Sequence, residues 1–204
     1  MKTTDTFKTI KSPSRGIFKD RGSRFIAYAI HVKSTDEVKS VLEEYRKEYH
    51  DARHHCYAYV LGFERSIWRT NDDGEPSGTA GKPIMGQINS FELTDILIVV
   101  IRYFGGTLLG TSGLIHAYKT AAFEAIKNSE IIELTVNDYF KIEFPYSSMN
   151  RVMKILKEEN IIQTDQAFGL NCSLIISFRV SAKDKIIKKL NLVEEIKLTY
   201  LETG

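Results

Sequence analysis

Two short stretches of this chain carry residue types that can bind ions. The first, residues 71–83, places three carboxylates, Asp72, Asp73 and Glu75, within four positions among glycines and prolines. Three carboxylates can hold one hard cation such as Mg²⁺, although this spacing is not that of an EF-hand loop. Alternatively, the segment is a hydrogen-bonded loop whose aspartates cap turns. We favour the loop, and we expect no bound metal and no cofactor.

The second stretch, residues 95–115, reads as a strand, a glycine-rich turn and the start of a helix. Residues 96–101 are all apolar and mostly β-branched, which is typical of a strand buried on both faces. Backbone N–H groups at such a junction can hold an anion, and glycine lets a ligand approach the main chain closely. The alternative is a tight connection without a ligand. The glycines of the turn are Gly105, Gly106, Gly110 and Gly113.

This turn matches neither of two common phosphate-binding loops. The spacing from Gly105 to Gly110 fits a Walker A loop, but Thr111 stands where that loop has lysine. The dinucleotide pattern also fails, because Gly105 and Gly106 are adjacent. The sequence therefore excludes a standard P-loop and a Rossmann turn.

Arg102 and Tyr103 end the predicted strand just before the turn, which is a common place for ligand-binding groups in open sheets. Arginine offers five donors to a phosphate, and tyrosine offers a face on which a base or sugar can stack. Alternatively, Arg102 pairs with a carboxylate of the acidic loop and holds that loop in place. Both interpretations place the two stretches side by side.

The adjacent residues His54, His55 and Cys56 could suggest a metal site or Cys–His catalysis. Neighbours on a strand point to opposite faces, so the three cannot all converge on one ion. Nothing in the sequence brings a distant histidine to Cys56, and a buried cysteine is more often inert. We therefore assign no catalytic residue.

The elements that position these stretches follow from hydrophobic periodicity. Alternation predicts strands over residues 25–32 and 57–63, and Ser34 with Glu37 forms a capping box that opens a helix. A short helix over residues 85–88 should precede the central strand and the helix that follows it. Three strands and three helices indicate an α+β layer. The basic lead-in before residue 25 can contact phosphates.

A composition break near residues 133–138 predicts a second domain. Beyond it, alternating and helical periods give the order strand, helix, strand, strand, helix, strand, which is the ferredoxin-like plan. We therefore divide the chain into domains of residues 1–135 and 136–204.

Composition limits the function further. The 204-residue chain is 43% hydrophobic and has a net charge of +2, so it can bury a core but has no general field for polyanions. Its two cysteines are far apart and suggest no disulfide framework. Because no segment reaches the length of a membrane span, we expect a cytoplasmic protein with no membrane partner. The sequence does not define the oligomeric state.

The motif DDGEPSGTAGKP, followed about twenty residues later by RYFGGTLLGTSGL, closely resembles the paired signature of the YigZ/IMPACT family in its bacterial, two-domain form. The resemblance extends over the whole chain. It implies a first domain with the left-handed β-α-β architecture of elongation factor G domain IV, and a ferredoxin-like second domain similar to domain V. Eukaryotic members regulate translation through an amino-terminal RWD domain, for which we expect no room before Phe25.

The resemblance favours a binding module, rather than an enzyme, that contacts RNA or a ribosomal component in translation. The alternative is a protein that binds a phosphate or nucleotide ligand, or an Mg²⁺-dependent enzyme of unknown substrate. A third is protein interaction through residues 137–204 alone. The predicted ligand-binding residues are Asp73, Glu75, Ser77, Thr79, Arg102, Tyr103, Gly105, Gly106, Gly110 and Gly113. The predicted nucleic-acid contacts are Arg15, Lys19, Arg21, Arg24 and Lys82.

Overall fold

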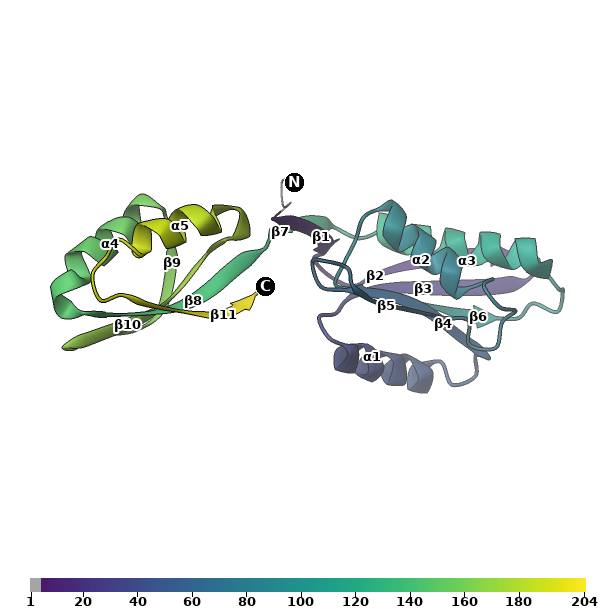
Figure 1. Ribbon diagram of the computed structural model, residues 1–204. Helices are drawn as coiled ribbons and strands as arrows, with labels where there is room; N and C mark the ends of the chain where they lie inside the picture. Colours follow the sequence, from purple (N-terminus) through teal and green to yellow (C-terminus); the bar gives the residue numbers. More distant parts are fainter. Residues whose placement is uncertain (1–4) are drawn as a thin grey trace. The chain divides into compact units, whose positions relative to one another are not determined.

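The computed structural model describes residues 5–204, which form an α+β protein (Figure 1). The chain divides into two compact units, Phe7–Leu134 and Thr135–Gly204 together with residues 5 and 6. The first four residues of the predicted basic lead-in lie outside the described part of the chain.

The larger unit is organised around a five-stranded sheet in the order β2-β3-β6-β4-β5. Every neighbouring pair is antiparallel. The predicted central strand is confirmed, because β6 lies in the middle of the sheet and its residues 96–101 are fully buried. The strands are β2 (Ser14–Asp20), β3 (Ser23–His31), β4 (His54–Leu61), β5 (Ile67–Asn71) and β6 (Ile96–Tyr103).

Helices cover both faces of this sheet (Figure 1). On one face, α2 (Gly81–Ser90) and α3 (Gly110–Lys127) pack against one set of strand residues, which includes Phe25 and Ile98. On the other face, α1 (Thr35–Glu48) packs against the alternate residues, such as Val99. The period of two along each strand produces this division, since successive side chains point to opposite faces.

The predicted start of α1 is confirmed. The Ser34 hydroxyl accepts a hydrogen bond from the Glu37 N–H at 3.1 Å. The Glu37 carboxylate accepts in turn from the N–H of Lys33 at 2.8 Å, one residue before the cap. The two bonds satisfy donors at the helix entrance, which fixes the point at which the chain leaves β3 for α1.

The prediction of three strands for the first domain was wrong, because β1 to β7 occur among its described residues. The predicted basic lead-in is not a free arm, since it contains β1 (Thr6–Ile10) and the edge strand β2. β1 forms a separate two-stranded sheet with β7 (Ile131–Thr135). These strands and β5 are short or lie at an edge, so polar side chains weaken their hydrophobic alternation.

The smaller unit has the predicted order of strands and helices. Its four strands form an antiparallel sheet in the order β11-β8-β10-β9, and the two helices lie on one side of it (Figure 1). Ile142, Leu174 and Ile176 are buried in its core. The elements are β8 (Asn137–Pro145), α4 (Met149–Glu158), β9 (Ile162–Ala167), β10 (Asn171–Arg179), α5 (Lys183–Leu190) and β11 (Lys197–Thr203).

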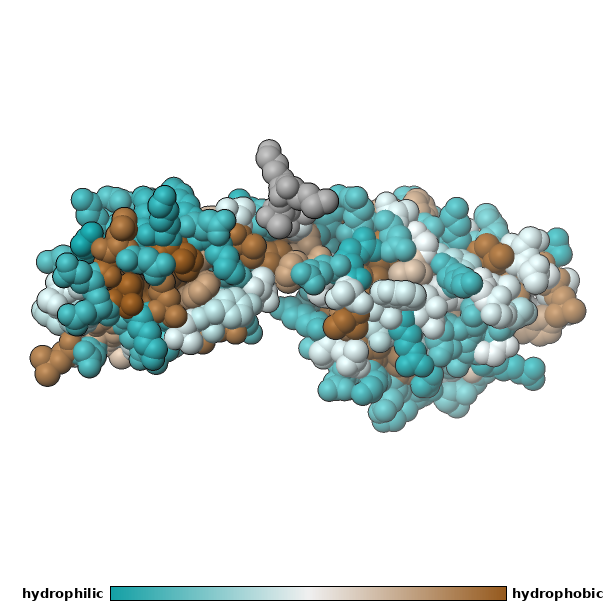
Figure 2. Space-filling model, in the orientation of Figure 1, coloured by the Kyte–Doolittle hydropathy of each residue, from teal (hydrophilic) through white to brown (hydrophobic). Residues whose placement is uncertain are grey.

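The visible surface of both units is mostly hydrophilic, with smaller hydrophobic patches between polar side chains (Figure 2). Among the described residues, no helix combines the length and the apolar character that crossing a bilayer requires.

Candidate functional site

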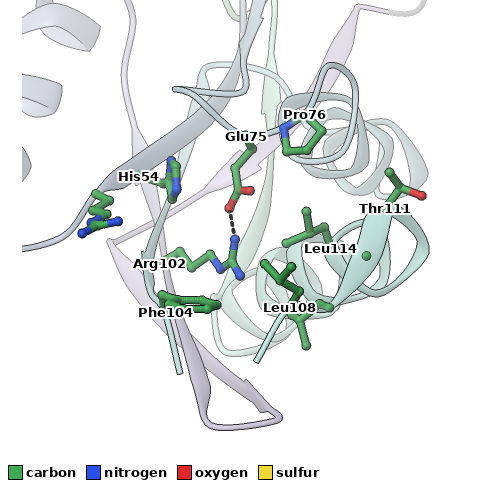
Figure 3. A pocket seen from close by; sticks show the side chains of 11 residues that line it. His54, Glu75, Pro76, Arg102, Phe104, Leu108, Thr111 and Leu114 are labelled. Carbon is green, nitrogen blue, oxygen red and sulfur yellow. Dashed lines mark hydrogen bonds and ion pairs between the residues drawn. The ribbon is translucent and has the colours of Figure 1, made fainter. Parts of the chain in front are cut away.

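A cavity of about 400 Å³ opens where the acidic loop and the glycine turn meet (Figure 3). This confirms that the two stretches lie side by side. We call this cavity the signature pocket. It is lined by Arg53 and His54 before and at the start of β4, Glu75 and Pro76 of the acidic loop, Arg102 of β6, and Phe104, Leu108, Leu109, Gly110, Thr111 and Leu114 of the turn and α3.

A buried ion pair forms one wall of the signature pocket. Arg102 Nη1 donates to Glu75 Oε1 at 2.6 Å, and the two side chains are only 7% and 3% exposed. The hydroxyl of Tyr118 donates to the same oxygen at 2.7 Å. Figure 3 shows Glu75 and Arg102 approaching each other between His54 and Leu114. The ion pair therefore holds the acidic loop against β6 and α3.

Arg102 has further donors that are not used within residues 5–204. Its Nε is buried and has no hydrogen-bond partner among residues 5–204, and Nη2 makes no hydrogen bond to this part of the chain either. The guanidinium lies 5.5 Å from the ring centroid of Phe25 and 5.6 Å from that of Phe104. Buried donors without hydrogen bonds lower the stability of the fold unless another group accepts from them. Arg102 is therefore the residue of the pocket most in need of an acceptor.

Cys56 extends the buried polar contacts away from the pocket. Its Sγ lies 3.3 Å from the Tyr118 hydroxyl and 3.0 Å from the carbonyl oxygen of Asp72, and its one proton can serve only one of them. Burial is the main cause that raises the pKa of both the Cys56 thiol and the Tyr118 phenol. A protonated, buried thiol is a poor nucleophile, so these contacts are structural.

The three carboxylates of the acidic loop have separate partners within the protein. Asp72 accepts hydrogen bonds from the N–H groups of Gly78, Ala80 and Gly81 at 2.8 to 3.0 Å. Burial opposes ionisation of Asp72, but these three donors lower its pKa overall. Asp73 accepts from the N–H of His55 at 2.7 Å, while Glu75 pairs with Arg102.

This arrangement is that of the hydrogen-bonded loop, with the three carboxylates engaged by different donors. Within residues 5–204, no group of three or more His, Cys, Asp and Glu side chains is placed to hold a metal.

Of the predicted ligand-binding residues, Glu75, Arg102 and Gly110 line the signature pocket. Ser77 is exposed outside it, and Thr79 donates to the carbonyl of Pro76 at 2.6 Å. Tyr103 does not join Arg102, because adjacent strand residues face opposite ways. It packs on the α1 face and donates to Asp51 at 2.7 Å.

Two glycines of the turn, Gly105 and Gly113, serve chain packing, whereas Gly106 and Gly110 have open space around them. A Cβ on Gly105 would lie 1.9 Å from the carbonyl carbon of Gly22, so only glycine fits beside the β2–β3 hairpin. Gly113 packs on Leu109, and Gly106 has a φ of +87° in the turn. Sequence reasoning missed the apolar wall, although the exposed apolar residues Phe104 and Leu108 in a turn were a signal for it.

The predicted nucleic-acid residues fall into two groups. Arg15, Lys19 and Arg24 lie on the α1 face, near the β2 edge of the sheet, with the half-exposed Ile17 between them. We call these four residues the basic strip. The other two predicted residues are Arg21 in the β2–β3 turn and Lys82 on α2, on the opposite face from the strip.

The cations of the basic strip repel one another, and two of them lie beside aromatic rings. The carboxylate of Asp51 is near enough to Arg24 for the pKa of Asp51 to be lowered, first by its hydrogen bond from Tyr103 and to a lesser extent by Arg24. Lys19 lies directly opposite Arg24 in the β2–β3 pair, where like charges repel. The guanidinium of Arg15 lies 5.6 Å from the ring centroid of Tyr28, and that of Arg24 lies 4.7 Å from that of Tyr103. Within residues 5–204, none of the three forms a salt bridge.

The family model of the Impact N-terminal domain matches residues 21–126, which include both signature stretches and most of the five-stranded sheet. The chain therefore belongs to the IMPACT family.

Within that family it is a YigZ-like bacterial member. It is 37% identical to IMPACT family member YigZ of Escherichia coli, over 72% of this chain and 75% of that protein. It is 36% identical to an IMPACT family member of Haemophilus influenzae, over 76% of each. A crystal structure of a hypothetical protein matches 97% of this chain and 98% of its own, with a TM-score of 0.71 and 27% identity.

Proposed function

We propose that this protein is a binding module that contacts RNA, ribosomal RNA included, through the basic strip. The observation that carries the proposal is a set of three cations that form no salt bridge within residues 5–204, on a part of the sheet next to two tyrosine rings. A phosphate group bound beside Lys19 and Arg24 would offset the repulsion between their like charges. Tyr28 and Tyr103 are half-buried, and an arginine already lies over each ring. The proposal therefore relies on the cations and not on stacking of bases on these rings.

The proposal differs from the sequence-based hypothesis in its contact residues. Arg102 is 6% exposed and is held by Glu75, so it cannot reach the phosphates of an RNA strand. The glycine turn and Arg102 therefore leave the RNA-binding surface, and Arg15, Lys19 and Arg24 remain. Lys82 lies on the other face of the sheet and contributes only if a partner wraps around the unit.

The link to translation rests on the family resemblance. We propose a signature domain of residues 1–135 with the left-handed β-α-β architecture of elongation factor G domain IV. We propose likewise that residues 136–204 form a ferredoxin-like domain similar to domain V. In support, α1 joins β3 to β4 across the shared neighbour β6, and the smaller sheet has the order β11-β8-β10-β9.

Salt-dependent binding to a short single-stranded RNA tests the proposal. For the double variant Lys19→Ala, Arg24→Ala, we expect weaker binding and a salt dependence whose log–log slope is smaller by about 1.4, since each phosphate contact contributes about 0.7. Fluorescence anisotropy at several salt concentrations measures both. The matched control is Lys154→Ala, Lys157→Ala on α4, which removes the same charge and should bind like the unmodified chain. Absent binding, or an equal loss in both double variants, would refute the proposal.

A further inference from the structure

We propose that the signature pocket binds a small organic anion, with its carboxylate or phosphate group at the N-terminus of α3 and its apolar body against the glycine turn. This site is separate from the basic strip. It lies on the α2/α3 face of the sheet, whereas the strip lies on the α1 face. The inference therefore goes beyond the proposed RNA contact.

The first turn of α3 supplies donors for the anionic group. Gly110 and Thr111 line the pocket at the start of this 18-residue helix. The N-cap residue is Leu109, which makes no side-chain capping bond, and the first turn contains no acidic residue. The leading N–H groups and the positive end of the helix dipole are thus left for a ligand.

Arg102 provides an independent reason to expect an anion. It is more than nine-tenths buried, lines the same pocket, and retains Nε and Nη2 without partners among residues 5–204. Arg53, also in the lining, is exposed. Two arginines (+2) against Glu75 (−1) leave a local charge of +1 around the cavity. A carboxylate or phosphate would neutralise this excess and can accept the remaining hydrogen bonds.

The rest of the lining indicates an apolar body. Phe104 is 51% exposed and Leu108 is 81% exposed, although both border the cavity. Covering them would remove apolar surface from water, which favours binding. A volume of about 400 Å³ also lies in the range of small-molecule sites. Inorganic phosphate alone would leave this apolar wall uncovered.

His54 adds a feature for specificity. Its Nδ1 lies 2.8 Å from the carbonyl oxygen of Asp73, which can only accept, so Nδ1 carries the proton in this contact. In the neutral ring, Nε2 is then an acceptor. A ligand with a hydroxyl group near the anion would match this acceptor as well as the donors of Arg102.

Titration of the full-length chain with four probes tests the inference. Phenyl phosphate and benzoate carry both an anionic group and an apolar body, inorganic phosphate lacks the body, and benzyl alcohol lacks the charge. We expect saturable binding by calorimetry, and a rise in Tm, with at least one of the first two. Inorganic phosphate and benzyl alcohol should bind more weakly. No response to either aromatic anion, or a response no stronger than that to inorganic phosphate, would overturn the inference.

Three variants that leave the ion pair intact locate the site. Thr111→Glu places a carboxylate at the start of α3, where it favours the helix but repels an anion, so the Kd of the aromatic anion should rise about tenfold or more. Ser112→Glu has the same effect on the helix but does not line the pocket, so its Kd should change much less. Leu108→Ser should weaken the aromatic anions without weakening inorganic phosphate.

Equal affinities in the unmodified chain and Thr111→Glu would contradict the assigned site. The variant Lys19→Ala, Arg24→Ala separates this inference from the RNA proposal. It should bind the aromatic anion normally, because the basic strip lies on the opposite face. A loss of anion binding in this variant would show that the strip, and not the pocket, holds the anion.

Discussion

The two faces of the five-stranded sheet handle charge in opposite ways. On the α2/α3 face, the charge of Arg102 is buried and held by Glu75, which also accepts from Tyr118 of α3. On the α1 face, a single helix covers the sheet and leaves Arg15, Lys19 and Arg24 without salt bridges in the described chain.

This contrast separates residues that maintain the fold from residues that are free to bind. A buried ion pair is costly to break, because the remaining charge is left desolvated. An exposed cation contributes little to stability and remains available to a partner. The two faces should therefore respond differently to substitution.

The largest expected effect concerns the buried face. Glu75→Gln removes the charge that balances Arg102, and we expect the free energy of unfolding to fall by about 3–5 kcal/mol. Chemical denaturation measures this change. Asp51→Asn, which changes the exposed carboxylate that accepts from Tyr103 on the α1 face, should leave the denaturation midpoint nearly unchanged. Similar losses in the two variants would remove the proposed difference between the faces.

An intermediate effect is expected at the close contact between Gly105 and Gly22. Gly105→Ala forces the glycine turn away from the β2–β3 hairpin, and overpacking of this kind costs about 1–3 kcal/mol. Gly86→Ala is the control, because a Cβ there meets nothing within 4 Å in the exposed surface of α2. It should raise stability by about 0.5–1 kcal/mol, since alanine favours a helix. A Gly105→Ala variant as stable as the unmodified chain would contradict the contact.

The smallest expected effect is a pH dependence of stability from His55, which lies on the part of the α1 face that is covered. His55 is buried, and burial is the main cause that lowers its pKa below the usual 6.5. The unfolded chain then takes up a proton that the folded chain does not, so stability should fall as the pH drops below about 6.5. Denaturation midpoints between neutral and mildly acidic pH measure this slope. His55→Gln should flatten it and the exposed His50→Gln should not; an unchanged slope in His55→Gln would exclude His55 as the source.

The sequence predicted those features that local patterns determine. The apolar run of residues 96–101 became β6, Ser34 capped α1, and the acidic loop met the glycine turn at Arg102. Each of these depends on a hydrophobic run, a capping residue or a pair of opposite charges that can be seen in the sequence.

Features that depend on packing between distant segments were not predictable. The role of Gly105 depends on Gly22, eighty-three residues earlier, and no local pattern reveals that approach. The partners of Asp72 and Asp73 are backbone N–H groups, which every residue except proline offers. The edge strand β2 was missed because its outward positions carry Arg15 and Lys19, which hide its alternation.

One carboxylate oxygen of Glu75 connects the acidic loop to two other elements at once. Strand β6 reaches it through Arg102, and helix α3 reaches it through Tyr118. A ligand that binds the remaining donors of Arg102 would therefore also stiffen the contact that holds the loop and α3. Binding in the pocket should therefore change the mobility of the acidic loop and of the start of α3 together.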